Sequence, residues 1–564
     1  MTFDCDAVIV GSGPSGSTVA DVLTSHGWSV IVLEKGRNHL LSLEAPFAPL
    51  EHFSNDEVKA VDRGLLGPDP ITEPRTFRRS AADGDHLVVG DCHAIPSTVG
   101  GGGVHADGKL PRLRQVDFEL RSALGPVDGA DVVDWPIDYA ELEPYYTAVE
   151  YAIGVAGEET NPFAEWRSAP FPMRPGADMF GAVRSTAAAE RLGLHPYRAP
   201  TGVNSVPYDG RPACNNCGFC GMYGCAIEAK GDPVALLRRA LRTGRCEVRP
   251  ESVVTDITTD ASGRRATGVR YLDSQRNVHE VRARHVVLAA GAFETPRLLL
   301  LNDIANSSDL VGRHLMYHFQ TLTVGGFPEQ LFGERGRSVT HAHDDFIDGD
   351  EASAAAARSA GLPWIRGGLV EHGAAAGPVL EAKSYGPGVH HPASMRDSSL
   401  RRRLWVLTLQ AEDLAQPNNR IDLHPSVRDV WGRPAGRLTY SPHRHELVAS
   451  AHYGPIQEAI LREADAEWAF SVTSPPSGHD IEALRDQGLG LPPASYHMMG
   501  TARMGDDPTT SVVDPFGQCW NVEGLHIVDS SVFATSAGYN PTLTICALAH
   551  RTASLLAGAP LSAV

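Results

Sequence analysis

Short apolar runs and glycine-rich turns alternate in the first forty residues of the chain. Residues 5–10 are an apolar run, residues 15–26 fit a helix, and residues 29–33 are a second apolar run. Apolar runs of this length, joined through a tight turn and a helical segment, predict a strand, a helix and a second strand. This order indicates the start of a parallel α/β sheet.

The same kind of pattern returns after a long excursion. Strand-like runs occupy residues 252–257 and 268–272, and another apolar run covers residues 285–290. This run stops at Gly291, ahead of a predicted helix at 294–301. We therefore expect the chain to re-enter the first sheet here.

The remaining hydrophobic patterns concern the middle and the end of the chain. Residues 524–529 are a candidate buried strand, and residues 542–556 form an apolar segment that predicts a helix. Residues 354–375 are rich in Ala and Gly and have no clear period, so they are predicted to be loop. Both ends of the chain are expected to meet on one nucleotide.

Length and charge narrow the class of protein. A chain of 564 residues is too long for one core, which predicts two or more lobes. The net charge of −19 disfavours nucleic acid and anionic membranes as partners and would favour a cationic substrate, although it also serves solubility. No apolar run approaches the length of a membrane span, and the first residues enter a strand directly, so we expect a cytoplasmic protein.

A dinucleotide-binding fingerprint lies between the first strand and the first helix. Gly11, Gly13 and Gly16 have the GxGxxG spacing. In this motif the first glycine permits the turn, the second admits a pyrophosphate, and the third allows close packing of helix on strand. Glu34 ends the second strand, where a carboxylate can accept hydrogen bonds from ribose hydroxyls and would repel a 2′-phosphate. The motif leaves FAD and NAD open.

Later motifs resemble those of the glucose/methanol/choline (GMC) oxidoreductases. The first has four consecutive glycines at 100–103 within TVGGGGVHADGKLPRLRQVD, and another reads VVLAAGAFETPRLLL at 286–300. The matching segments follow one another in the family's order at 98–117, 134–146, 286–300, 310–315 and 495–544. The chain is therefore similar to this family along most of its length.

The resemblance implies a Rossmann-like FAD-binding domain with a discontinuous α+β substrate-binding domain. The FAD-binding domain would comprise residues 1–40, 88–118, 205–320 and 495–564. The substrate-binding domain and its lid would comprise residues 41–87, 119–204 and 321–494.

The resemblance also implies which residues contact FAD. They are Gly11, Gly13, Ser15, Gly16, Glu34, Gly101, Gly102, Gly103, Val254, Ala290, Asp529, Ser530, Asn540 and Thr542. One position departs from the family pattern, because Asp107 stands where many members have Asn. A carboxylate beside a reduced, anionic flavin would be unfavourable, which puts a flavin contact at this position in doubt.

Oxidation of an alcohol removes a hydride from carbon and a proton from oxygen, so the site needs a base. His497, which precedes Met-Met-Gly-Thr, is the candidate because imidazole titrates near neutral pH. Asn540 is its expected partner, since an amide can donate to the substrate oxygen. Outside this context, His497 would be an ordinary surface or core histidine, and Asn540 a turn residue before Pro541.

Four of the nine cysteines are clustered with the spacing C-x2-C-x2-C-x4-C. They are Cys214, Cys217, Cys220 and Cys225. Such spacing is compatible with an iron–sulfur cluster or with zinc. It is also compatible with thiols, or a local disulfide, that shape a loop near the flavin, as in cluster-free branches of the family. We expect FAD as the cofactor and no metal.

The resemblance implies an FAD-dependent dehydrogenase or oxidase that acts on a CH–OH group. The Cys-rich element is similar to that of family members which oxidise a hydroxymethyl group of aminoglycoside precursors, so a sugar or aminoglycoside primary alcohol is the expected substrate. A flavin-containing lyase or decarboxylase, an iron–sulfur sugar dehydrogenase and a flavin-binding protein without turnover are the alternatives. The electron acceptor stays open.

Overall fold

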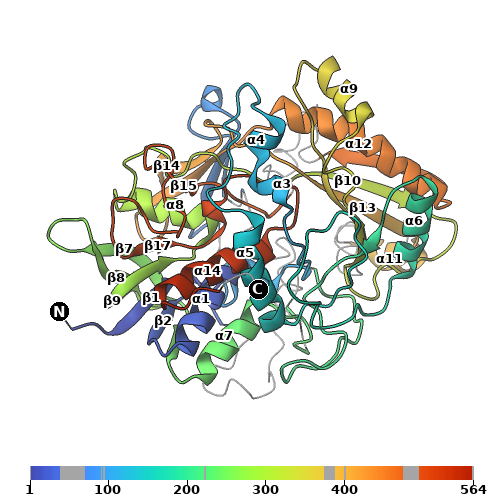
Figure 1. Cartoon of the computed structure of the whole chain (residues 1–564). Coiled ribbons are helices and arrows are strands. Elements are labelled where there is room, and N and C mark those ends of the chain that lie inside the picture. The colour runs from blue at the N-terminus through green and yellow to red at the C-terminus, as the bar shows by residue number, and fades with distance from the viewer. Residues whose placement is uncertain are drawn as a thin grey trace.

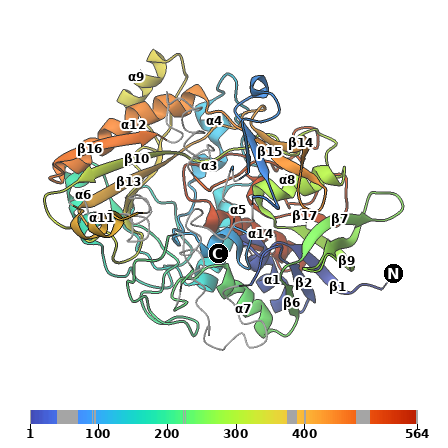
Figure 2. The ribbon, with the colours of Figure 1, turned by 180° about the vertical axis from the view of Figure 1, so that it is seen from behind.

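The chain folds around two large sheets that lie side by side (Figures 1 and 2). The structure is a computed structural model that describes residues 2–38, 70–90, 92, 96–221, 224–225, 227–373, 388–398, 402–473 and 495–561. The predicted domain segments 41–87 and 321–494 therefore lie partly outside the described residues.

The first sheet has seven strands in the order β6-β2-β1-β9-β8-β7, with β17 paired to β9. The strands are β1 (Cys5–Val10), β2 (Val30–Leu33), β6 (Cys246–Arg249), β7 (Val253–Thr259), β8 (Ala266–Leu272), β9 (Val278–Leu288) and β17 (Leu525–Ile527). The strands β6, β2, β1, β9 and β17 are parallel, whereas β7 and β8 are antiparallel to their neighbours. Three distant parts of the sequence thus build one sheet, as the hydrophobic pattern predicts.

Helices cover this sheet. They are α1 (Pro14–Ser25), α5 (Tyr139–Ile153), α7 (Pro233–Arg242), α8 (Gly291–Leu301) and α14 (Thr542–Leu556), of which α1 packs against α7 and α14. Helix α1 begins directly after β1 because Pro14 occupies its first position, where a missing N–H costs nothing. The last helix of the chain therefore lies beside the first, as Figure 1 shows.

The second sheet has six antiparallel strands in the order β16-β10-β13-β12-β11-β5. They are β5 (Tyr197–Arg198), β10 (Phe319–Gly326), β11 (Val339–His343), β12 (Gly368–Gly373), β13 (Leu404–Ala411) and β16 (Trp468–Thr473). Helix α12 (Arg444–Glu463) packs on β10 and β16, and α6 (Phe180–Arg191) packs on β11 and β12. This half holds its own buried cluster around Trp405, so the chain has more than one core, as its length predicts.

Smaller elements connect the two halves. A four-stranded sheet contains β3 (Arg75–Arg78), β4 (Val88–Gly90), β14 (Arg420–Arg428) and β15 (Pro434–Thr439). The short helices are α3 (Gln115–Phe118), α4 (Leu120–Leu124), α9 (Glu351–Ser359), α11 (His391–Asp397), η1 (Ala81–Asp83), η2 (Gly101–Val104) and η3 (Ser530–Val532).

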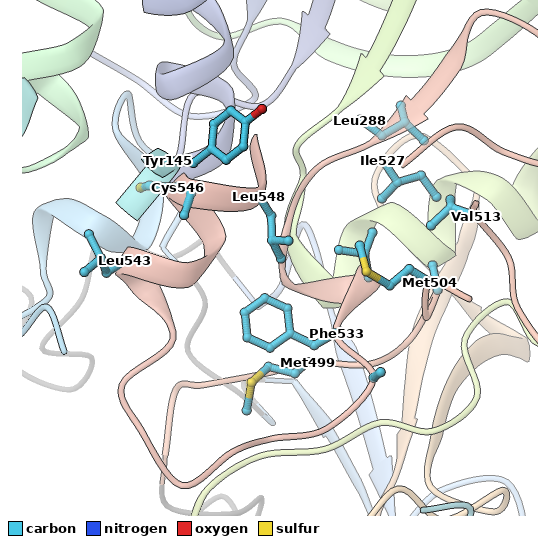
Figure 3. Close-up of a cluster of buried hydrophobic side chains, with 14 of the residues drawn as sticks. Tyr145, Leu288, Met499, Met504, Val513, Ile527, Phe533, Leu543, Cys546 and Leu548 are labelled. Carbon is cyan, nitrogen blue, oxygen red and sulfur yellow. The ribbon is translucent and has the colours of Figure 1, made fainter. Parts of the chain in front are cut away.

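The largest buried cluster joins the C-terminal segment to the first sheet (Figure 3). Leu288 of β9 and Ile527 of β17 belong to the same cluster as Phe533 and Leu548, which follow later in the chain. Burying side chains of this size stabilises by about 1.5–3 kcal/mol each. The C-terminal segment is thereby held against the strand ends where the functional residues lie.

The predicted elements of the first sheet are confirmed, with small shifts at their ends. Helix α8 begins at Gly291 rather than at Glu294, and Gly291 turns the chain out of β9 with a positive φ of 82°, which favours glycine. The loop prediction for 354–375 is wrong for residues 354–359, which belong to α9, and for residues 368–373, which form β12. Residues 360–367 are turn and irregular chain as predicted, and residues 374–375 lie outside the described residues. Ala favours helix strongly, and Asp350 caps α9 through Ser353.

Within the described part of the chain, no helix combines the length and the apolar character that a bilayer crossing requires. The domain boundaries and the cytoplasmic location stay predictions.

Candidate functional site

A cavity of about 200 Å³ opens at the carboxyl ends of β1 and β9. Gly11 lies at its edge with φ +101°, and a Cβ atom at this position would lie 2.4 Å from the carbonyl oxygen of Ala289. Gly13 also lines the cavity, and a Cβ atom on it would meet no atom within 4 Å. The first glycine is therefore required by the turn, whereas the second leaves space open for a ligand.

The four-glycine segment lies directly over this turn. A Cβ atom on Gly101 would lie 3.0 Å from the Cα atom of Gly13, and Gly101 and Gly102 both line the cavity. Gly16 and Gly103 have another role, because they pack against neighbouring chain and do not line the cavity. A Cβ atom on Gly16 would lie 2.0 Å from the Gly11 carbonyl oxygen. Gly101 and Gly102 thus border the ligand space, whereas Gly16 and Gly103 permit close packing.

Glu34 lines the cavity at the end of β2 and is held in place. Its Oε2 atom accepts hydrogen bonds from Ser12 N at 3.0 Å and Ser12 Oγ at 2.6 Å, and its Oε1 atom accepts one from Gly36 N at 2.8 Å. A carboxylate has about four acceptor positions, so one remains for a ribose hydroxyl. This arrangement suits a dinucleotide without a 2′-phosphate.

The other expected cofactor residues divide into those that line this cavity and those that do not. Ser15, Val254, Ala290, Asp529 and Ser530 line it. Thr542 instead lines a small neighbouring cavity with Gly103.

Asp529 joins two helix starts rather than presenting free oxygens. Its Oδ2 atom accepts from Gly291 N at 2.9 Å and Thr295 Oγ1 at 2.6 Å, and its Oδ1 atom accepts from Ser531 N at 3.0 Å. Burial raises its pKa, and the hydrogen bonds act in the opposite direction. The N-termini of α1 and α8, with their positive dipole ends, both border the cavity. An open glycine turn, a pinned carboxylate and two helix N-termini fit the ADP part of FAD.

His497 faces a second histidine that the sequence did not single out. Its Nδ1 atom lies 2.8 Å from Nδ1 of His318, and Nε2 of His318 lies 2.9 Å from the carbonyl oxygen of Ser536. Because a carbonyl only accepts, His318 donates from Nε2 and accepts at Nδ1. His497 then donates from Nδ1, so its Nε2 atom carries a free lone pair.

Both rings are held in the neutral state. Burial lowers the pKa of His318 to about 4, although the Ser536 carbonyl and Glu412 act in the opposite direction. Burial, the His318 ring and the Lys109 ammonium together hold the pKa of His497 well below its ordinary value of 6.5. The expectation that His497 titrates near neutral pH is therefore wrong, and the main reason is burial of the ring, to which the Lys109 ammonium adds.

A buried carboxylate fixes the loop that carries Ser536. Glu412 accepts from Ser536 N at 3.1 Å, Ser536 Oγ at 2.7 Å and Ala537 N at 2.9 Å through Oε1. Its Oε2 atom pairs with Arg366 Nη1 at 2.7 Å. Ala537 is held at φ 69°, which an alanine rarely adopts. This ion pair therefore positions the carbonyl that selects the tautomer of His318.

Asp107 does not present a free carboxylate. Its Oδ2 atom lies 3.2 Å from Lys109 Nζ, and the same ammonium lies 2.6 Å from Glu371 Oε2. Burial would lower the pKa of Lys109, but the Glu371 and Asp107 carboxylates raise it overall. The negative charge of Asp107 thus lies beside a cation instead of facing the flavin side unpaired.

Asn540 is buried in the turn that precedes α14. Its Oδ1 atom has no hydrogen-bond partner among the described residues. An unpaired buried amide oxygen is uncommon in folded proteins. The preceding residue, Tyr539, donates from its hydroxyl to Asp344 Oδ2 at 2.6 Å.

The four clustered cysteines are free thiols that share a cavity of about 220 Å³. Burial raises the pKa of Cys220 to about 12, and Lys230 donates to the Cys220 carbonyl at 3.1 Å and to the Val104 carbonyl at 2.8 Å. In the described ranges, no three His, Cys, Asp or Glu side chains are grouped as metal ligands. The segment is tied to the glycine-rich loop by Lys230, a contact that the sequence motif alone does not show.

The first sheet, the nucleotide cavity and the His318–His497 pair together define a flavin-dependent oxidoreductase. Sequence models of GMC oxidoreductases match residues 185–320 and 415–549. The 6'''-hydroxyparomomycin C oxidase of Streptomyces lividus is 30% identical over 98% of this chain and 91% of its own length. The chain belongs to the GMC oxidoreductase family.

Other relatives are also named as an oxidase or a dehydrogenase. Paromamine 6'-oxidase of Streptomyces fradiae is 29% identical over 98% of this chain and 91% of its own. The 2-methyl-1,2-propanediol dehydrogenase of Mycolicibacterium austroafricanum is 29% identical over 97% of this chain and 94% of its own length. Among solved structures, a formate oxidase variant of Aspergillus oryzae RIB40 has a TM-score of 0.66 at 15% identity, over 99% of each chain.

These findings confirm the GMC fold, FAD as the cofactor, and oxidation of a CH–OH group in a small molecule. They do not favour the lyase alternative.

Proposed function

We propose that the enzyme oxidises a primary alcohol of an amine-bearing, sugar-type substrate to an aldehyde, with His497 as the base. The observation that carries the proposal is the His318–His497 pair, in which Nε2 of His497 keeps a free lone pair. Such an atom can accept the hydroxyl proton as the carbonyl forms. FAD, when bound, supplies the acceptor for the hydride from carbon.

In this proposal the chain moves and holds charge in defined places. His497 becomes a cation on taking the proton, and His318 holds the ring in place by accepting from its Nδ1–H. Asn540, whose Oδ1 is unpaired, donates from its amide nitrogen to the substrate oxygen. The residues proposed to hold the cofactor are Gly11, Gly13, Ser15, Glu34, Gly101, Gly102, Val254, Ala290, Asp529 and Ser530, which border the cavity.

The substrate class is supported by two relatives whose names give aminoglycoside-type substrates, paromamine and 6'''-hydroxyparomomycin C. A net charge of −19 also attracts a polyamine sugar. Other relatives are named for 2-methyl-1,2-propanediol and fructose, which bear no amine. These compounds provide a panel that separates the possibilities.

The test is anaerobic mixing of the FAD-loaded enzyme with paromamine, 2-methyl-1,2-propanediol and fructose in turn. We expect paromamine to bleach the flavin fastest, and we expect His497→Ala to bleach far more slowly while keeping its FAD. Faster bleaching by an uncharged alcohol would refute the amine-bearing class. A variant at His497 with parental rates would refute the assignment of the base.

A further inference from the structure

A second cavity, of about 230 Å³, borders the residue next to Asn540. Its walls come from residues 110–114 and 158–171, and from Tyr539 and Asp344. It shares no lining residue with the nucleotide cavity. Tyr539 directly precedes Asn540 in the chain, so the cavity reaches the segment that carries the proposed catalytic amide, although Asn540 itself does not line it.

Asp344 gives this cavity a free acceptor. The residue is 1% exposed, and its Oδ2 atom accepts from Tyr539 Oη at 2.6 Å and from Asn161 Nδ2 at 3.0 Å. Its Oδ1 atom has no partner among the described residues. Burial raises the pKa of this carboxyl group. An unfilled acceptor in a buried carboxyl group is costly unless a ligand completes it.

Two of the three arginines that line the cavity are neutralised by buried glutamates. Arg112 pairs with Glu143 at 2.9 Å and with Glu150 at 2.8 Å. Arg167 also pairs with Glu150. These two arginines and two glutamates cancel in charge, so they contribute rigidity rather than attraction for an ion.

The remaining charges of the cavity are mainly negative. Glu159, Glu165 and Asp344 form no ion pair in the part of the chain that the structure describes. Glu158 pairs with Arg198 at 3.5 Å, and Arg114 with Asp348 at 2.9 Å. Three carboxylates therefore lack an ion-pair partner among the described residues, although the Arg114 guanidinium acts on Asp344. This excess of negative charge favours a positively charged occupant.

Donors and aromatic surface complete the cavity. The Nε and Nη1 atoms of Arg114 are buried and have no partner among the described residues, so they can donate to hydroxyl groups. Tyr139 and Trp166 meet edge to face at 5.9 Å, and both line the wall. Aromatic faces also attract ammonium groups. The cavity thus offers partners for both amines and hydroxyls.

We propose that this second cavity is a substrate-recognition site in which Asp344 binds an ammonium group and Arg114 donates to hydroxyls. The site would select amine-bearing sugars over uncharged ones. The assignment rests on the proposed function, because it takes the occupant to be the substrate. Binding and oxidation are nevertheless measured separately.

The test is calorimetric titration of the FAD-loaded enzyme with paromamine and with N-acetylated paromamine, which lacks the ammonium groups. We expect paromamine to bind about 10- to 100-fold tighter, as a charged hydrogen bond in a buried site contributes. Asp344→Asn should abolish most of this preference. Equal binding of the two probes, no binding of either, or an unchanged preference in the variant would overturn the proposal.

Asp345→Asn is the matched control. Asp345 is the next residue in the chain, but its Oδ1 atom lies 2.6 Å from His195 Nδ1 and it does not line the cavity. This variant should keep the preference for paromamine. If Asp344→Asn fails to fold, Glu159→Gln provides the test. Loss of this second unpaired carboxylate should weaken the preference for paromamine. An unchanged ratio of the two affinities would refute the site.

Flavin bleaching separates this proposal from the proposed function. Preferential binding of paromamine without bleaching would support the recognition site and refute paromamine oxidation. Bleaching by paromamine without any binding preference over the acetylated compound would support paromamine oxidation and refute the recognition site.

Discussion

The Nδ1 atoms of His318 and His497 lie 2.8 Å apart, and the Ser536 carbonyl determines which of them carries the hydrogen. The carbonyl accepts from the far side of His318, so the hydrogen between the rings belongs to His497. The lone pair on Nε2 of His497 is therefore directed away from His318. A backbone atom four residues before Asn540 thus selects the tautomer of the proposed base.

His497→Ala should slow flavin reduction by about 10²- to 10⁴-fold, which is the usual contribution of a positioned base. FAD content should stay near that of the parent, since His497 does not line the nucleotide cavity. Anaerobic stopped-flow absorbance measures the rate of flavin reduction, and the flavin absorbance before mixing gives the FAD content. Asn540→Ala should cost less, and the double variant should lose less than the product of the two effects.

The pH dependence of flavin reduction should have its acid limb well below pH 6.5. His497 must be neutral to accept a proton, and its enclosed site lowers its pKa, so the neutral form predominates at pH 7. The rate should therefore be level around neutrality and fall only in acid. Reduction rates across this range provide the measurement, and a limb centred at or above 6.5 would contradict the structure.

His318→Gln should act through His497 rather than on the substrate. Loss of the neighbouring ring removes one of the influences that lower the His497 pKa, so the acid limb should move upward while the rate falls about tenfold or more. His343→Gln is the control, because His343 faces His372 at 2.8 Å in another buried pair. A limb that moves equally in both variants would indicate a general structural effect.

Gly13→Val should weaken FAD binding without unfolding the protein. A Cβ atom at this position meets nothing within 4 Å, so the larger side chain enters the space that the pyrophosphate needs. Gly13→Ala should have a smaller effect of the same sign. FAD retained after gel filtration, with the thermal transition of the apoprotein as control, gives the result. Parental FAD content in the valine variant would reject the proposed pyrophosphate contact.

Cys220→Ser should lower the free energy of unfolding by about 1–3 kcal/mol, because it places a hydroxyl group where a thiol is 8% exposed. Cys217→Ser should change stability little, since Cys217 is exposed. Chemical denaturation measures both. Stoichiometric iron and sulfide in anaerobically purified enzyme would instead favour the iron–sulfur alternative.

Local signals in the sequence determine the nucleotide-binding part of this protein. The GxGxxG turn, the strand at 5–10 and the helix at 542–556 depend on neighbours a few residues away, through backbone sterics and hydrophobic period. The family motifs add FAD and the class of reaction, which the comparisons confirm. The α9 helix is missed because the Ala and Gly content of 354–375 predicts loop, whereas the alanines of residues 354–357 favour helix.

Only the tertiary structure decides the protonation and the charge of the site. His318 and His497 are 179 residues apart, and Lys109 reaches Glu371 over 262 residues. Such pairs alter a pKa through burial and distance, and neither quantity is written in a local pattern. The same holds for Asp344, whose unpaired oxygen exists only because Tyr539, Asn161 and the cavity meet around it.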